Sequence, residues 1–141
     1  MGRCVSQHAD RNAFPTILAG DFDATPDSAS IRFLTGKQSL QEMSVHYLDA
    51  WAIAGDESPG YTWVHENPLA RIEMDRHARE RRHRRRIDYI FVGAPSESKH
   101  WARLRECRVE INRPEKGIWP SDHFAVYAEI DVMAPSQPQG S

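Results

Sequence analysis

Three short apolar runs, each carrying acidic residues inside it or at one end, constrain the fold of this chain more than any other feature. Such runs are typical of buried β-strands, and the last of the three also alternates between apolar and polar positions. The runs and their polar residues are 15–20 with Asp21 and Asp23, 87–92 with Asp88, and 124–130 with Asp122 and His123. Because strands form a rigid scaffold, we predict a site in which carboxylates hold a hard divalent cation beside a proton-transferring imidazole.

The rest of the sequence predicts short helices and two further strands. Residues 25–28 form a helix-start signal and are followed by apolar residues on one helical side. Further helices are predicted over 43–54, from the spacing of apolar residues, and over 69–86, which contains neither Gly nor Pro. Residues 61–64 and 104–111 are typical of strands. Five strands with few helices predict an α+β fold with a mostly antiparallel sheet.

Length and charge indicate one domain with an uneven charge distribution. The chain has 141 residues and 40% hydrophobic content, enough for one core. We assign residues 1–133 to the domain and predict that the tail 134–141 is disordered. The net charge of −2 hides a local basic excess, because residues 71–113 hold 13 Lys/Arg against 7 Asp/Glu. The basic residues are concentrated in an arginine-rich insert at about 70–86.

Two interpretations of this arginine-rich insert remain open. It could be a solvated helix or loop whose charges pair with one another. It could also bind the phosphates of DNA or RNA, because clustered arginines release counterions from a nucleic-acid backbone. The insert leads directly into the strand that carries Asp88, so Arg84, Arg85 and Arg86 are the candidates for contact with a substrate phosphate or nucleic acid.

The cysteines and the apolar content favour a reducing compartment. Cys4 and Cys107 have no metal-binding spacing and are predicted to be free thiols, with a disulfide between them as the alternative. No apolar run approaches the roughly 18 residues that span a bilayer, so we predict a cytoplasmic protein without a transmembrane segment. Residues 1–6 match the N-myristoylation pattern, with Cys4 placed for a second acyl chain, although such a short pattern also occurs by chance.

Three motifs, in this order, resemble the C-terminal half of the endonuclease/exonuclease/phosphatase superfamily, whose fold is that of pancreatic deoxyribonuclease. The motifs are Gly20-Asp21-Phe22-Asp23, Arg86-Ile87-Asp88-Tyr89 and Ser121-Asp122-His123. The resemblance covers about residues 13–132. It implies half of a four-layer α/β/β/α sandwich, and a phosphoester hydrolase (a phosphodiesterase, nuclease or phosphatase) that uses Mg²⁺ or Mn²⁺.

The resemblance also implies a role for each acidic residue of the motifs. Asp21 would orient or activate the attacking water near the metal, and Asp122 would support the metal directly or through water. His123 would contact the scissile phosphate and transfer a proton, while Asp88 orients it and stabilises its charge. Asp23 stands where the family motif usually has an asparagine that positions water and phosphate. A carboxylate there would either tighten metal binding or repel phosphate.

Family members also carry an N-terminal half with a metal-binding glutamate, and no counterpart of that half is found before Pro15. A half-fold would leave apolar surface and strand edges uncovered, so we expect self-association, with a second copy facing the first. The alternative function is a catalytically inactive half-domain that binds nucleic acid or self-associates.

Each motif also has a purely structural interpretation. Asp21 and Asp23 could begin a turn and cap the following helix, and Asp88 could pair with one of the arginines 84–86. The aromatic residues Trp51, Tyr61 and Trp63 are predicted to lie in the core rather than to stack on bases.

Overall fold

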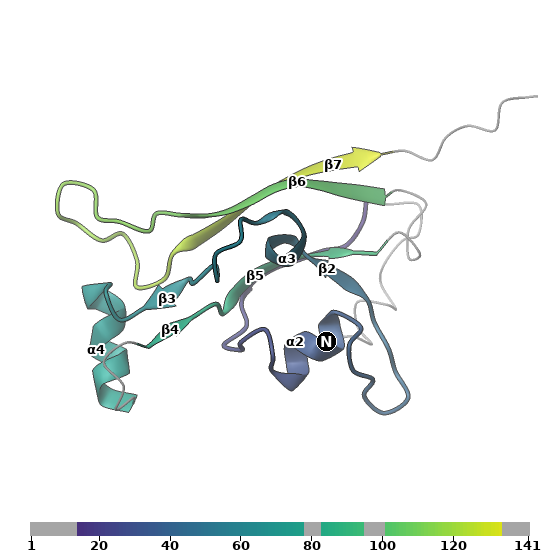
Figure 1. The fold of residues 1–141 in the computed structure, drawn as a ribbon, viewed down its shortest axis with the longest axis horizontal. Coiled ribbons are helices and arrows are strands. Elements are labelled where there is room, and N and C mark those ends of the chain that lie inside the picture. Colours follow the sequence, from purple (N-terminus) through teal and green to yellow (C-terminus); the bar gives the residue numbers. More distant parts are fainter. Residues whose placement is uncertain (1–13, 78–82, 95–100, 134–141) are drawn as a thin grey trace, which may run out of the picture.

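The computed structural model describes residues 14–77, 83–94 and 101–133 (Figure 1). Several sequence predictions therefore lie outside the described residues: the acylation pattern with Cys4, the middle of the arginine-rich insert, and the tail 134–141. Within the described ranges, no helix is long and apolar enough to cross a membrane.

The described chain forms seven strands and three helices. In chain order they are β1 (Ile17–Asp21), α2 (Ala29–Leu34), β2 (Tyr47–Asp49), α3 (Ala50–Ala54), β3 (Trp63–Val64), α4 (Pro68–His77), β4 (Arg84–Arg85), β5 (Asp88–Gly93), β6 (Trp101–Glu110) and β7 (Ala125–Met133). The strands form one sheet of order β1-β5-β2 and two pairs, β3-β4 and β6-β7, and every pairing is antiparallel. This confirms the predicted α+β class.

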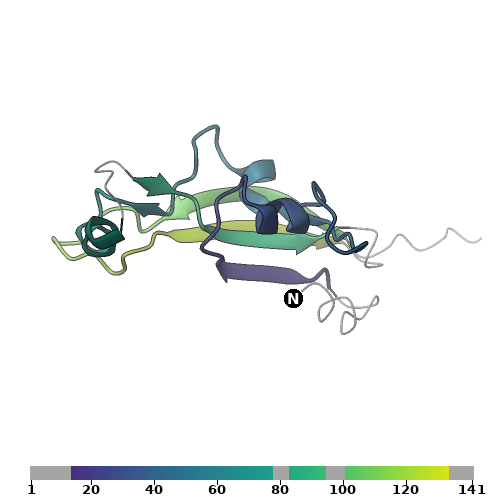
Figure 2. The same cartoon turned by 90° about the horizontal axis from the view of Figure 1, so that it is seen from below.

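The central sheet is built on β5, which is buried or partly buried along its whole length. Its antiparallel register with β1 places Ile17 opposite Val92 and Asp21 opposite Asp88. Figure 2 shows β1 at the outer edge of this sheet, with β5 beside it. The sheet thus brings two of the predicted carboxylates to the same end of neighbouring strands.

One face of the sheet packs against helix α2. The helix begins after Ser28, as the start signal predicts, and buries Ile31 and Leu34 against Tyr89 and Phe91 of β5. The Tyr89 hydroxyl donates to the carbonyl oxygen of Ala24 at 2.7 Å, and burial raises the pKa of Tyr89 well above its ordinary value. This core fixes the segment between β1 and α2, which contains Asp23.

The helix predicted over residues 43–54 is wrong in its first half. Residues 47–49 form β2, which pairs with β5, and only 50–54 are helical. Asp49 marks the change, because its side chain accepts hydrogen bonds from the backbone N–H groups of Trp51 (3.1 Å) and Ala52 and so caps α3. Residues 47–49 are extended because they pair with β5, on the side of β5 that β1 does not occupy.

The single helix predicted over residues 69–86 is also wrong at its end. Helix α4 begins at Pro68, directly after Asn67, whose side-chain oxygen accepts from the Leu69 N–H at 3.0 Å. Arg84 and Arg85 form β4, in which Arg85 lies opposite Trp63 of β3. The arginines next to Asp88 are therefore held in a short two-stranded ribbon.

The predicted strands at 104–111 and 124–130 form the long hairpin β6–β7, which packs on β5 and α3 (Figure 1). Cys107 lies on the inward face of β6 as a free, buried thiol. Burial raises the pKa of this thiol from 9.0 to about 11.

Candidate active site

Two carboxylates lie directly opposite each other at one end of the central sheet. Asp21 on β1 pairs with Asp88 on β5 in the antiparallel register. Like charges placed directly opposite on neighbouring strands destabilise a sheet. The backbone holds Asp88 in place, because Thr62 Oγ1 accepts the N–H groups of both Ile87 and Asp88 at 3.2 Å. This end of the sheet is therefore a favourable place for a cation or a hydrogen-bond donor.

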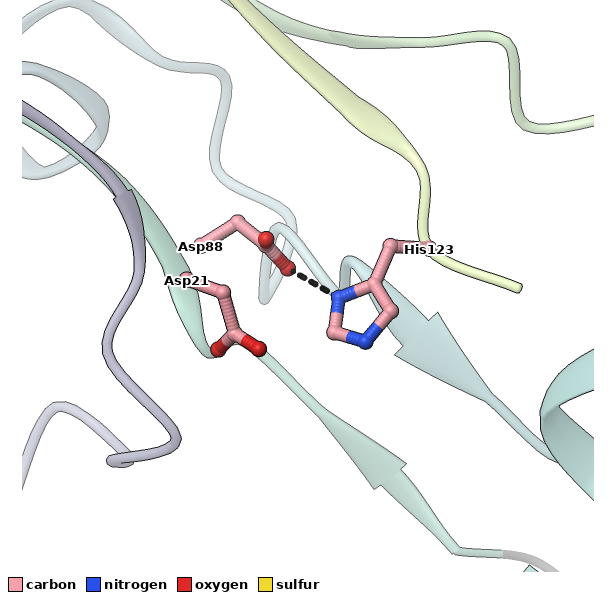
Figure 3. A group of neighbouring side chains, drawn as sticks. All are labelled: Asp21, Asp88 and His123. Carbon is pink, nitrogen blue, oxygen red and sulfur yellow. Dashed lines mark hydrogen bonds and ion pairs between the residues drawn. The ribbon is translucent and has the colours of Figure 1, made fainter. Parts of the chain in front are cut away.

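His123 supplies such a donor. Its Nδ1 lies 2.8 Å from Asp88 Oδ2, and both side chains are mostly buried (Figure 3). An ionised carboxylate only accepts hydrogen bonds, so we assign the ring proton to Nδ1, which leaves Nε2 as an acceptor. The proposed pairing of Asp88 with an arginine does not occur within the described chain, where its side chain pairs with His123.

Hydrogen bonds hold the loop before β7 in place around His123. Asn67 is fully buried, and its amide nitrogen donates to the carbonyl oxygens of Ser121 (2.8 Å) and Asp122 (3.1 Å). The N–H of Phe124 donates to the carbonyl oxygen of Thr62 at 2.7 Å. Sequence analysis missed Asn67 and Thr62. Thr62 lies in the strand predicted over residues 61–64. Asn67 bonds Ser121, which is 54 positions away, so no pattern in the neighbouring sequence indicates its role.

Three side chains of the site could hold a metal ion. One ligand atom each of Asp21, Asp88 and His123 lie within 4.8 Å of one another, and Figure 3 shows Asp21 beside the Asp88–His123 pair. Carboxylate oxygens and a water-accessible position suit Mg²⁺ or Mn²⁺. Asp122, the other predicted ligand, is not in this group, although its Oδ2 lies 3.9 Å from His123 Nε2.

Asp23 lies next to these residues in a left-handed backbone conformation, with a φ of 43°. Its N–H donates to Asp21 Oδ1 at 2.8 Å, so the turn after β1 orients the Asp21 carboxylate. Its own carboxylate, 82% exposed, pairs with Arg85 Nη1 at 3.3 Å. Asp23 therefore contacts both Asp21 and the arginine-rich segment.

The three candidate arginines have three different surroundings. Arg84 forms an exposed ion pair with Glu66, and this hydrogen bond lowers the pKa of Glu66. Arg85 pairs with Asp23. Arg86 is buried, and its two terminal nitrogens bond both oxygens of the buried Asp49 at 3.1 and 2.9 Å. Its burial and its two hydrogen bonds to Asp49 favour a structural role for Arg86 over the predicted contact with substrate.

The three aromatic residues predicted to lie in the core also have three different surroundings. Trp63 is partly buried, and its ring centroid lies 6.1 Å from that of His123, so it forms a wall of the site. Trp51 is partly buried against the backbones of Gly55 and Gly60. Tyr61 is exposed. None of the three belongs to the buried core: Trp51 and Trp63 are both partly buried and Tyr61 is exposed.

Comparison with known proteins gave one match. Residues 7–123 match the model of the Endonuclease/Exonuclease/phosphatase family, which is most of the chain and includes every residue of the site described above. No curated protein and no solved structure matched the chain.

Proposed function

Because this chain belongs to the endonuclease/exonuclease/phosphatase family, a family of hydrolases that generally use a divalent metal, we propose that it hydrolyses a phosphoester with Mg²⁺ or Mn²⁺. The observation that carries this proposal is the 2.8 Å hydrogen bond between Asp88 and His123, with the Asp21 carboxylate beside it. An acid–imidazole pair next to a carboxylate is suited to moving a proton while charge develops on a phosphate.

In this proposal Asp21 is the main ligand of the metal, with the Asp88 carboxylate beside it. Asp122, which the sequence also predicts as a ligand, lies next to His123 and would support the metal through water. The negative charges of Asp21 and Asp88, which lie opposite each other in the sheet and repel, favour such an ion. When bound, a divalent cation neutralises the charge that develops on the phosphoryl oxygens.

His123 is the proposed proton-transfer residue. The Asp88 carboxylate holds the proton on Nδ1 and stabilises a positive charge on the ring, so Nε2 is free to accept a proton from the attacking water or to contact the phosphate. Asn67 and Thr62 act through His123 and Asp88, because they fix the loop and the strand that carry these side chains.

The proposed overall arrangement is one half of the family's four-layer α/β/β/α sandwich. The sheet packed against α2, with the hairpin β6–β7 beside it, supports this arrangement. Within phosphoesters, the arginine-rich insert makes DNA or RNA the candidate substrate.

Hydrolysis of an activated phosphodiester, such as bis(4-nitrophenyl) phosphate, tests the proposal. The purified chain should release nitrophenolate with Mn²⁺ or Mg²⁺, lose this activity in excess chelator, and regain it when metal is restored. The Asp21→Asn variant should need more metal for half-maximal rate. Absence of turnover together with salt-sensitive binding of a DNA duplex would reject the enzyme and support the nucleic-acid-binding alternative.

A further inference from the structure

The two arginines of β4 face opposite sides of the β3–β4 ribbon. Arg85 lies directly opposite Trp63 in the antiparallel register, so these two side chains project from the same face. Trp63 is the residue whose ring lies beside His123. Arg84, one position away on the strand, projects from the other face and pairs with Glu66. Of the two arginines of β4, Arg85 is thus the one that faces the active site.

The ion pair between Arg85 and Asp23 leaves most of the guanidinium group available. A guanidinium carries five N–H donors, and the contact to Asp23 joins Nη1 to one carboxylate oxygen. The Arg85 side chain is about one-third exposed and that of Asp23 is almost fully exposed. An exposed ion pair of this kind contributes little stability. The ion pair instead fixes the position of Arg85. Because the backbone N–H of Asp23 also donates to Asp21, the pair holds the guanidinium close to the Asp21 carboxylate.

We propose that Arg85 binds the non-bridging phosphate oxygens of the substrate and that Asp23 is the positioning residue for Arg85. The inference rests on the proposed function and assigns a phosphate-recognition residue to it. Guanidinium and phosphate form charge-assisted, often bidentate hydrogen bonds, which a lysine or an amide does not reproduce. The pair also gives a reason for a carboxylate at position 23, where an asparagine would be expected: a carboxylate holds a guanidinium by charge, and an amide does not.

Binding of inorganic phosphate tests the role of Arg85 without requiring turnover. Calorimetric titrations would compare the wild type with Arg85→Gln and with Arg84→Gln, with and without Mg²⁺. The second variant removes the same charge from the same strand but from the opposite face. Arg85→Gln should weaken phosphate binding by about tenfold or more, because hydrogen bonds to charged groups are the strong ones. Arg84→Gln should bind phosphate as the wild type does, and equal effects of the two variants would overturn the assignment.

Steady-state kinetics on the phosphodiester test the role of Asp23. Asp23→Ala should raise KM in the same direction as Arg85→Gln, and the double variant should be no worse than Arg85→Gln alone, because both changes remove one interaction. Arg85→Lys should rescue only part of the loss. Additive effects, or tighter phosphate binding by Asp23→Ala, would contradict a positioning role. Wild-type turnover that Arg85→Gln leaves unchanged would reject this inference alone, whereas a wild type that neither turns over nor binds phosphate would reject the proposed function as well.

Discussion

At the scale of single residues, Asp88 is the most constrained side chain of the site. It lies opposite Asp21 in the sheet, its backbone N–H donates to Thr62 Oγ1 as that of Ile87 does, and its carboxylate bonds His123 at 2.8 Å. Each contact has a separate consequence: the first favours a cation, the second fixes the strand end, and the third sets the tautomer of the imidazole. The chemistry proposed for His123 therefore depends on a carboxylate at position 88.

Replacing Asp88 by asparagine should reduce kcat for phosphodiester hydrolysis by about 10²–10⁴-fold, the usual contribution of acid–base catalysis. The amide can bond the ring but cannot stabilise a positive imidazole. KM should change little. Kinetics with saturating Mn²⁺ measure both constants, and a loss of less than about tenfold would show that His123 functions without its carboxylate.

At the scale of elements, Arg86 lies between β4 and β5 and connects the central sheet to helix α3. It makes this connection through Asp49, the residue that caps α3 and accepts two hydrogen bonds from Arg86. The guanidinium lies 4.6 Å from the centre of the Tyr89 ring. Breaking a buried pair of this kind leaves an uncompensated charge.

Arg86→Met should therefore lower the free energy of unfolding by about 3–5 kcal/mol, because Asp49 stays buried without its partner. Urea denaturation followed by circular dichroism measures the change. Arg84→Gln is the matched control, since it breaks an exposed pair two residues earlier in the chain and should leave the urea midpoint nearly unchanged. Equal midpoints for the two variants would contradict the structural role of Arg86.

Cys107 on β6 gives a pH dependence of stability. Its thiol keeps a pKa of about 11 in the folded state, against 9.0 when solvated. The folded chain therefore holds this proton between these two values, and the unfolded chain releases it. The free energy of unfolding should fall as pH rises through this window, by about 1–2 kcal/mol near pH 10.5.

The difference between the wild type and Cys107→Ala, measured by urea denaturation at about pH 8 and again near pH 10.5, isolates this effect from other groups that titrate there. The wild type should lose more stability than the variant between the two pH values. Parallel losses would mean that solvent reaches the thiol, and rapid alkylation of the folded protein at about pH 8 would agree with that outcome.

At the scale of the whole molecule, patterns in the sequence predicted the elements that define the site, and long-range pairing decided the rest. The apolar runs ending at Asp21 and containing Asp88 are strands, and the start signal at Ser28 begins a helix. Residues 47–49 fit a helical spacing equally well, and their pairing with β5 could not be seen locally. The same holds for Arg84 and Arg85, which pair with β3 about twenty residues earlier in the chain.

The site could be predicted only in part for the same reason. The three apolar runs suggested that Asp21, Asp88 and His123 share a site, and the family resemblance supplied their roles, but residue patterns alone do not say which strands are neighbours. The carboxylates that pair with Arg84, Arg85 and Arg86, and so give them different roles, could not be predicted from the sequence. Asp49 lies 37 positions from Arg86, and Asp23 lies 62 positions from Arg85.

The open edge of β1 should lead to self-association. In the described ranges β1 pairs on one side only, and Ile17 on this edge strand is 52% exposed. Open apolar edges pair with other strands, and two antiparallel copies of β1 would form a symmetric contact. Light scattering at low micromolar concentration should detect a dimer. Ile17→Lys should yield a monomer, whereas Ile72→Lys, at an equally exposed position on α4, should not. A monomeric wild type would contradict the expectation.

The comparison of two histidine variants tests the central claim most directly. His123 pairs with Asp88 in the site, while His65 forms a similar pair with Asp75 at 3.0 Å, outside the group of residues that could hold a metal. In Mn²⁺-dependent hydrolysis of a phosphodiester, His123→Ala should abolish turnover and His65→Ala should retain it, with both variants folded by circular dichroism. Turnover that survives in His123→Ala, or is lost equally in both variants, would contradict the assignment of the active site.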